Sequence, residues 1–275
     1  MEQRIALVTG ASSGIGEVTA LELLRRGFVV YGAARRVERM QGIAEAGARV
    51  LELDVTDDDS MRAAVDAILA ERGRIDVLVN NAGYGSYGAL EDVPIDEARR
   101  QFEVNVFGLA RLTQLVLPGM RERRSGTIVN ISSIGGKIYE PLGSWYHATK
   151  FAVEGLSDSL RVELAPHGID VVIIEPGAIR TEWNGISRDG AIARSGATAY
   201  AGQAQTLVRT YEAVDGPRLA ADPQVVAEAI AKAVMAKRPR TRYAVPSSAK
   251  LVLFLRWLLP DRAFDRLVGR IFGGS

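Results

Sequence analysis

Apolar runs and amphipathic stretches alternate along most of the chain. Between the runs, apolar residues recur at helical spacing, as at Met61, Val65, Ile68 and Leu69. The runs themselves have the pattern of buried parallel strands, at 5–8, 29–31, 50–53, 77–79, 127–131 and 171–174. Strand and helix in alternation, with connections long enough for crossovers, predict an α/β fold. We expect a doubly wound, mostly parallel sheet of about seven strands, with helices on both faces.

Two segments depart from this alternation. Residues 178–221 are rich in glycine, alanine and serine and exceed the usual length of a structureless connection, so we expect a substrate lid there. Residues 247–273 have the pattern of amphipathic helices broken at Pro260. Packing of these helices on the protein's own body or on a second subunit is favoured over contact with a membrane surface. The prediction is a single domain over residues 1–275, with this lid and a C-terminal helical extension.

Composition narrows the class of protein. With 275 residues and 47% hydrophobic residues, the chain can bury a large core. A formal net charge of +1 gives no global field that would recruit nucleic acid, so the expected partner is a small molecule. The chain has no cysteine and two histidines far apart in sequence, so we expect no metal site. Without a signal-peptide pattern or a long apolar span, we expect a cytoplasmic protein with no integral membrane association.

A glycine-rich turn follows the first predicted strand. Its sequence is Thr9-Gly10-Ala11-Ser12-Ser13-Gly14-Ile15-Gly16, and a helical run comes next. Glycines allow the backbone to approach a pyrophosphate closely, and the following helix directs its free N–H groups at the phosphates. The second strand ends in Arg35 and Arg36, where an NAD site usually has an acidic residue. The pattern therefore predicts NADP(H), with Arg35 on the 2′-phosphate; the alternative is a pair of solvated surface arginines.

These and later motifs, in this order, resemble the short-chain dehydrogenase/reductase family in its ordinary, non-extended form. The motifs are Thr9-Gly10-x-x-x-Gly14-x-Gly16, Asp54-Val55, Asn80-Asn81-Ala82-Gly83, Asn105, Ser133, Tyr146-x-x-x-Lys150 and Pro176-Gly177-x-x-x-Thr181. Segments 80–85, 88–92 and 101–108 are similar to the 17β-hydroxysteroid dehydrogenase-like branch. The resemblance implies a Rossmann fold and an oxidoreductase that acts on CH–OH groups.

Tyr146 and Lys150 stand four residues apart on a predicted helix and so share one face. A phenol, with an ordinary pKa of about 10, moves protons poorly at neutral pH unless a nearby cation favours the phenolate. Lys150 would supply that cation. The resemblance implies that Tyr146 exchanges a proton with the substrate oxygen, that Ser133 hydrogen-bonds the same oxygen, and that Lys150 also holds the nicotinamide ribose.

Asn105 lies on an apolar helical stripe with Phe102 and Leu109, and a buried amide must find partners there. It is either a satisfied core asparagine or, as the resemblance implies, the anchor of a water that orients Lys150; both roles can hold together.

The cofactor site predicted from the glycine turn and the resemblance is larger than the turn alone. Its residues are Gly10, Ser12, Ser13, Gly14, Ile15, Gly16, Arg35, Asp54, Val55, Asn81, Ala82, Gly83, Tyr146, Lys150, Pro176, Gly177, Ile179 and Thr181. By the resemblance, Asp54 and Val55 flank the adenine, and Asn80 with Gly83 lines the cofactor channel. Ile179 and Thr181 would face the nicotinamide amide.

The predicted function is an NADP(H)-dependent carbonyl reductase or alcohol dehydrogenase for a lipophilic substrate such as a steroid or retinoid. Five aromatic residues fall on loops near the expected rim of the site: Tyr84, Tyr87, Tyr139, Trp145 and Trp183. The alternatives are a reductase of carrier-bound ketones and a binding protein that senses NADP(H) without turnover. The intact Ser, Tyr, Lys and Asn set argues against the second of these. By analogy with the family, we expect a homo-oligomer, a dimer or tetramer.

Overall fold

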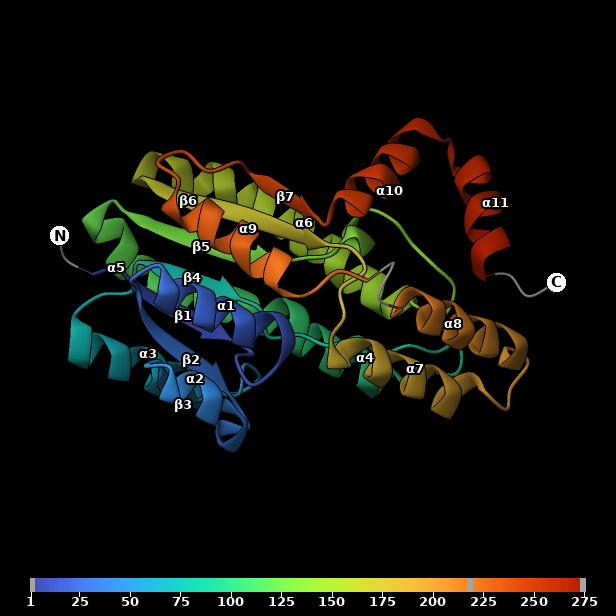
Figure 1. The fold of residues 1–275 in the computed structure, drawn as a ribbon, viewed down its shortest axis with the longest axis horizontal. Helices are drawn as coiled ribbons and strands as arrows, with labels where there is room; N and C mark the ends of the chain where they lie inside the picture. Colours follow the sequence, from blue (N-terminus) through green and yellow to red (C-terminus); the bar gives the residue numbers. More distant parts are fainter. Residues whose placement is uncertain (1–2, 217–219, 273–275) are drawn as a thin grey trace.

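The computed structural model describes residues 3–216 and 220–272, and its core is one parallel sheet with helices on both faces (Figure 1). The seven strands lie in the order β3-β2-β1-β4-β5-β6-β7. Their bounds are β1 Ile5–Thr9, β2 Val29–Ala34, β3 Arg49–Glu52, β4 Val77–Asn80, β5 Gly126–Ile131, β6 Ile169–Pro176 and β7 Arg242–Val245. The predicted doubly wound α/β fold is confirmed, and each of the six apolar runs is a strand.

Side chains alternate between the two faces of the sheet and build two cores. Ala6 and Val8 of β1 face one layer, formed by α1 (Gly14–Arg25), α2 (Gln41–Glu45) and α9 (Gln224–Met235). Ile5 and Leu7 face the other, formed by α3 (Asp58–Arg72), α5 (Leu109–Arg123) and α6 (Ser144–Leu164). Because both faces are covered, the central strands are buried throughout, which is why they read as continuous apolar runs.

The helix predicted around Asn105 is continuous but not uniform. It consists of α4 (Ile95–Phe102), a π-helical stretch at Glu103–Gly108 (η2), and α5. Short 3₁₀ turns occur at Val37–Met40 (η1), Ile134–Gly136 (η3) and Ala165–His167 (η4). A π-helical turn inserts an extra residue into the helix, and it often marks a functional position.

Two helical hairpins complete the chain (Figure 1). Residues 178–221, expected as a lid, contain α7 (Glu182–Ser195) and α8 (Ala201–Val214), which pack on each other beyond the carboxyl ends of the strands. The C-terminal extension is α10 (Ser247–Leu258) followed by α11 (Asp261–Phe272), with the break at Pro260 where the sequence predicted it. None of the helices in the described part of the chain is long and apolar enough to span a bilayer.

Candidate active site

The glycine turn after β1 is shaped by close backbone contacts. Gly10 and Gly14 adopt positive φ angles of 65° and 58°. A Cβ on Gly16 would lie 2.2 Å from the carbonyl oxygen of Gly10 and 2.5 Å from Nδ2 of Asn81, so a side chain there is excluded. The backbone N–H of Asn81 donates to the Thr9 hydroxyl at 3.0 Å, and its side-chain amide donates to the Thr9 carbonyl at 2.9 Å. Asn81, which directly follows β4, thus holds the turn in place through these two hydrogen bonds.

The amino end of α1 is open toward this turn. Ser13 is the N-cap residue, and its side chain makes no capping hydrogen bond. The first N–H groups of a helix carry partial positive charge and need acceptors. Together with the side-chain-free surface at Gly16, this fits the pyrophosphate of a dinucleotide, as the sequence predicted.

The end of β2 presents cationic side chains. Arg35 and Arg36 are both exposed, and Arg35 forms no ion pair within residues 3–216 or 220–272. Arg39 instead pairs with Glu182 of α7, at 3.2 and 2.5 Å. The Arg35 guanidinium is therefore available to an added phosphate. Asp54, by contrast, accepts from the backbone N–H and the hydroxyl of Thr56 at 2.9 and 2.8 Å, which is a turn contact.

Tyr146 and Lys150 project from α6 toward the carboxyl end of β5, which carries Ser133. The Lys150 Nζ donates to the carbonyl of Ile131 at 2.9 Å and lies 5.9 Å from the centre of the Tyr146 ring. The Ser133 Oγ accepts from the N–H of Gly135 at 3.0 Å and donates to the carbonyl of Pro176 at 3.4 Å. The structure thus brings together the three side chains that the sequence grouped.

The ionisation of Tyr146 differs from the expectation. Burial raises the pKa of its phenol above the ordinary value, while a hydrogen bond with Ser133 acts in the opposite direction. Burial also lowers the pKa of Lys150, to about 8, against the raising effect of Glu154. The predicted lowering of the phenol pKa by Lys150 is therefore absent here. The physical reason is that the phenol is withdrawn from water, while the ammonium lies nearly 6 Å from the ring and binds a carbonyl.

Asn105 is buried in the π-helical stretch and is fully engaged. Its Oδ1 accepts from the backbone N–H of Tyr84 at 3.0 Å, and its Nδ2 donates to the Tyr84 carbonyl at 2.9 Å and to the Thr149 hydroxyl at 3.1 Å. A Cβ on Gly83 would lie 3.1 Å from the same Oδ1. Asn105 therefore links the loop after β4 to α6. Its partner in α6 is Thr149, the residue before Lys150.

The other predicted cofactor residues follow the carboxyl ends of β3, β4 and β6, and two of them contact the glycine turn. Thr181, the N-cap residue of α7, lies over it: a Cβ on Gly14 would be 3.3 Å from its methyl group. Gly177 donates to the carbonyl of Val245 at 2.7 Å, and Ile179 is buried. The backbone N–H of Ala82 donates to the Thr9 hydroxyl at 3.0 Å. Val55 is buried in the neighbouring core.

An aromatic cluster stands against Tyr146. The rings of Tyr87 and Trp183 are centred 5.7 and 5.0 Å from the Tyr146 ring. The sequence named both, but it missed two residues behind them. The Tyr87 hydroxyl donates to Glu140 at 2.7 Å, and the hydroxyl of Tyr211, from α8, contacts both groups. No local signal marks Tyr211 or Glu140, since they meet only because α8 packs over the loop before α6.

The other three aromatic residues named from the sequence lie elsewhere. Tyr84 hydrogen-bonds Glu97 of α4 at 3.3 Å. Tyr139 is covered by the C-terminal extension, with its ring 5.4 Å from that of Phe264. Trp145 points away from its neighbour Tyr146, because adjacent residues of a helix face different sides. The expectation that Trp145 is on a loop at the rim of the site is therefore wrong, because it belongs to α6 and faces Phe102.

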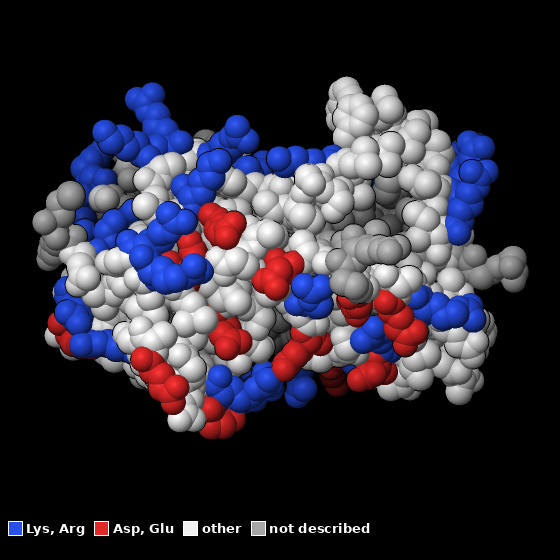
Figure 2. Space-filling model, in the orientation of Figure 1, with Lys and Arg blue, Asp and Glu red and all other residues white. Residues whose placement is uncertain are grey.

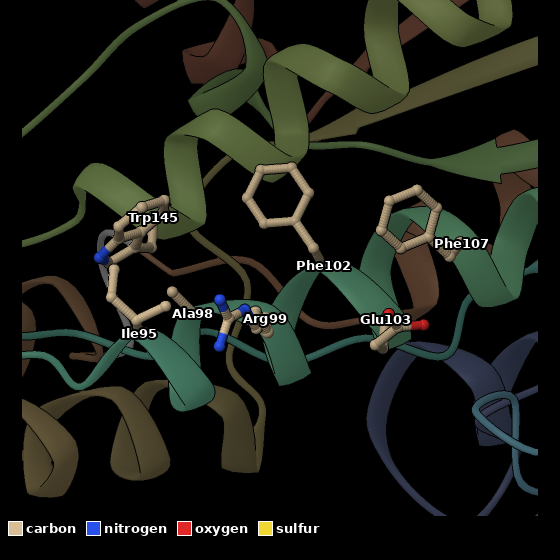
Figure 3. Close-up of a pocket in the computed structure, with 7 residues that line it drawn as sticks. All are labelled: Ile95, Ala98, Arg99, Phe102, Glu103, Phe107 and Trp145. Atoms are coloured by element: carbon tan, nitrogen blue, oxygen red, sulfur yellow. The ribbon is translucent and has the colours of Figure 1, made fainter.

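Trp145 instead lies in a shallow apolar groove between α4 and α6 (Figure 3). The ring of Phe102 meets it edge-on at 6.4 Å. The groove is lined by Ile95, Ala98, Arg99, Phe102, Glu103, Phe107 and Trp145. None of these belongs to the predicted catalytic set, so this groove is separate from the candidate active site.

Comparison with known proteins is consistent with the site's geometry. The sequence model of one family, described as short chain dehydrogenase, matches residues 4–191. A 3-ketodihydrosphingosine reductase of Bacteroides thetaiotaomicron is 45% identical over 181 residues, 66% of each chain. An NADPH-dependent 3-dehydrocapnine reductase of Ornithobacterium rhinotracheale is 35% identical over 276 residues, 96% of this chain and 95% of that one. The crystal structure of a short-chain dehydrogenase from Streptomyces avermitilis is 38% identical, with a TM-score of 0.80 over 97% of this chain and 95% of that chain.

Proposed function

Because the chain belongs to the short-chain dehydrogenase family, whose members are oxidoreductases that use a nicotinamide cofactor, we propose that it interconverts a ketone or aldehyde and its alcohol with NADP(H). The observation that carries this proposal is the convergence of Ser133, Tyr146 and Lys150 at the carboxyl edge of the sheet, beside the glycine turn. Ligands of doubly wound sheets bind at this edge.

Tyr146 is the proposed general acid in reduction and general base in oxidation. Burial raises the pKa of its phenol, so Tyr146 is protonated at neutral pH, and the Lys150 ammonium would stabilise the phenolate that is left when the proton is transferred. Ser133 would donate a second hydrogen bond to that oxygen, where negative charge develops. One N–H of the Lys150 ammonium group donates to the carbonyl of Ile131. Its other N–H groups would bind the ribose hydroxyls. The nicotinamide, when bound, supplies or accepts the hydride.

The preference for NADP(H) rests on Arg35. Its exposed guanidinium follows β2, and no carboxylate stands at that position to repel a 2′-phosphate. A charge-assisted bond is worth about 1.5–3 kcal/mol, so Arg35→Gln should weaken NADPH binding about ten- to hundredfold and leave NADH binding unchanged. Arg36→Gln is the matched control, with a smaller expected effect. Equal use of NADH and NADPH by the unaltered protein would contradict the role of Arg35.

The proposed substrate class rests on the apolar side chains packed around Tyr146. Tyr87, Trp183, Leu142 and the lid residue Leu207 form one apolar cluster with Tyr146. Such a lining favours a lipophilic ketone or alcohol, in keeping with the resemblance to the 17β-hydroxysteroid dehydrogenase-like branch. Two of the relatives are named as reductases of 3-ketodihydrosphingosine and 3-dehydrocapnine. We propose that α7 and α8 form the lid over this substrate.

The proposed assembly is a homo-oligomer formed through the groove of Figure 3. Phe107 and Ile95 there are more than half exposed. Apolar side chains gathered in this way mark an association surface. We expect the protein to work in the cytoplasm. Because the chain has no cysteine, it forms no disulfide and needs no oxidising compartment.

The test of the function is oxidation of NADPH by the purified protein against a panel of steroid, retinoid, aliphatic and carrier-bound ketones, with NADH alongside. Turnover of a free lipophilic ketone is the expected result. Tyr146→Phe should reduce turnover about 10²- to 10⁴-fold while NADPH still binds. Full turnover in that variant would remove Tyr146 from the mechanism. NADPH binding without turnover of any panel member would favour the binding-protein alternative, and turnover of only carrier-bound ketones would favour the other alternative.

A further inference from the structure

Helix α10 carries an apolar face that the described chain leaves uncovered. Leu251, Phe254, Trp257 and Leu258 are 60%, 52%, 78% and 56% exposed. Their spacing puts them on one side of the helix, and the rings of Phe254 and Trp257 lie 5.9 Å apart. The opposite side holds the buried Ala249 and packs on β7. Large apolar side chains usually occur singly on a protein surface, so a continuous face of four indicates a binding surface.

The unpaired charges of the α10–α11 hairpin are basic in the part of the chain that the structure describes. Arg262, Arg266 and Arg270 recur every four residues along the exposed side of α11, and none of them forms an ion pair within the described ranges. The two acidic residues are engaged within the protein, since Asp261 pairs with Arg256 at 2.8 Å and Asp265 accepts from the Tyr139 hydroxyl at 2.7 Å.

Figure 2 shows the resulting surface, which has an uncharged protrusion over the outer end of α10. Basic side chains lie along the outer flank of α11. Lys250 adds one exposed basic group on the apolar side of α10.

We propose that the α10–α11 hairpin is a docking surface for an anionic lipid bilayer. Apolar side chains on one helix would enter the boundary between headgroups and acyl chains, with Trp257 at the depth that tryptophan prefers. The arginine stripe would face the phosphates, and each basic group near such a surface raises partitioning about fivefold. The arginine stripe complements the phosphates of an anionic bilayer but not an identical stripe on a second copy, so charge complementarity favours the bilayer.

The hairpin also reaches the candidate active site. Phe272, at the end of α11, packs against the hydrophobic cluster that contains Tyr146 together with Ala204 and Leu207 of α8. The carbonyl of Ile271 accepts from the hydroxyl of Thr210 in α8 at 3.4 Å. The same element therefore joins the lipid-facing surface to the lid. If the proposed function holds, a bilayer bound at this hairpin would lie beside the lid helix α8.

The experiment is sedimentation of the full-length protein with vesicles of phosphatidylcholine alone and of an equimolar mixture of phosphatidylcholine and phosphatidylglycerol. We expect binding to the mixed vesicles that weakens with added salt, and little binding to phosphatidylcholine alone. The double variant Phe254→Ser/Trp257→Ser should lose binding at least tenfold. The triple variant Arg262→Gln/Arg266→Gln/Arg270→Gln should lose the preference for the anionic lipid.

The matched control is the double variant Val162→Ser/Met235→Ser, which removes two exposed apolar side chains, one on α6 and one at the end of α9. It should bind like the unaltered protein. Tryptophan emission gives a second readout: the blue shift on adding mixed vesicles should disappear in Trp257→Phe.

No binding to either vesicle, or equal loss in the control variant, would overturn the proposal. A fall in the oligomeric mass of Phe254→Ser/Trp257→Ser, measured by light scattering, would also overturn the proposal if no vesicle binding is seen. That result would assign the apolar face of α10 to a second copy. These readouts need no turnover, so a failure of the proposed function would leave them unchanged.

Discussion

Arg242 holds together a cluster of buried carboxylates behind the candidate active site. This first residue of the edge strand β7 donates to Glu154 at 3.0 and 3.1 Å and to Asp158 at 2.6 Å, and it lies 3.4 Å from Glu175. The side chains of Glu154 and Glu175 are each only 4% exposed, and that of Arg242 is 27% exposed. Arg242→Met keeps much of the side-chain volume and removes the charge.

The expected loss of stability depends on pH. Removing one partner of a buried ion pair costs about 3–5 kcal/mol, and we expect about 3 kcal/mol here because Lys137 still contacts Glu154 at 3.0 Å. Burial and the charge of Glu154 raise the pKa of Glu175 to about 7 in the folded protein. When folding raises the pKa of a carboxyl group, the folded protein loses stability as the pH rises from the pKa of the unfolded chain to that of the folded protein. The effect of the substitution should therefore be largest at about pH 8.5 and smaller by at least about 1 kcal/mol at about pH 5.5.

Urea unfolding followed by tryptophan fluorescence, at one protein concentration and both pH values, measures this difference. Arg240→Met is the control: this exposed arginine lies two residues away and forms no ion pair within the described chain, so the change should stay within about 0.5 kcal/mol. A loss below about 1 kcal/mol at both pH values, or one that does not vary with pH, would refute the reasoning.

Three further substitutions test other parts of the structure. Gly16→Ala places a Cβ 2.2 Å from a backbone oxygen of the glycine turn, so the affinity for NADPH, measured by calorimetry, should fall at least tenfold. Gly155→Ala is the control and should not change this affinity, because the space around Gly155 is open. Glu140→Ala removes the acceptor that the buried hydroxyls of Tyr87 and Tyr211 share, so one of them is left without a partner, and thermal or urea unfolding should show a loss of about 1–3 kcal/mol; no loss would mean that water replaces the carboxylate. Phe107→Glu puts a charge in the groove of Figure 3 and should dissociate the proposed oligomer in light scattering, and an unchanged mass would place the interface elsewhere.

Local patterns in the sequence were sufficient for the architecture and the central site. Buried parallel strands must be apolar on both faces, so six of the seven were visible as apolar runs. The seventh, β7, lies at the edge of the sheet, where the half-buried Arg242 and Tyr243 interrupt that pattern. Tyr146 and Lys150 could be paired because the helical period alone puts them on one face. The glycine turn was likewise readable, since its conformation needs residues without side chains.

The tertiary structure decided which distant side chains meet and how deeply each is buried. Glu140, Tyr87 and Tyr211 are separated by long stretches of chain, and their contact depends on how α8 packs over the loop before α6. The raised pKa of Tyr146 also depends on distant segments, because Tyr87 and Trp183 pack against its ring and burial removes the phenol from water. The sequence by itself determined the strands, the turn and the shared face of Tyr146 and Lys150, because these follow from periods of a few residues along one element. Burial, ionisation and the outward face of α10 depend on elements far apart in the chain, so only the folded arrangement could settle them.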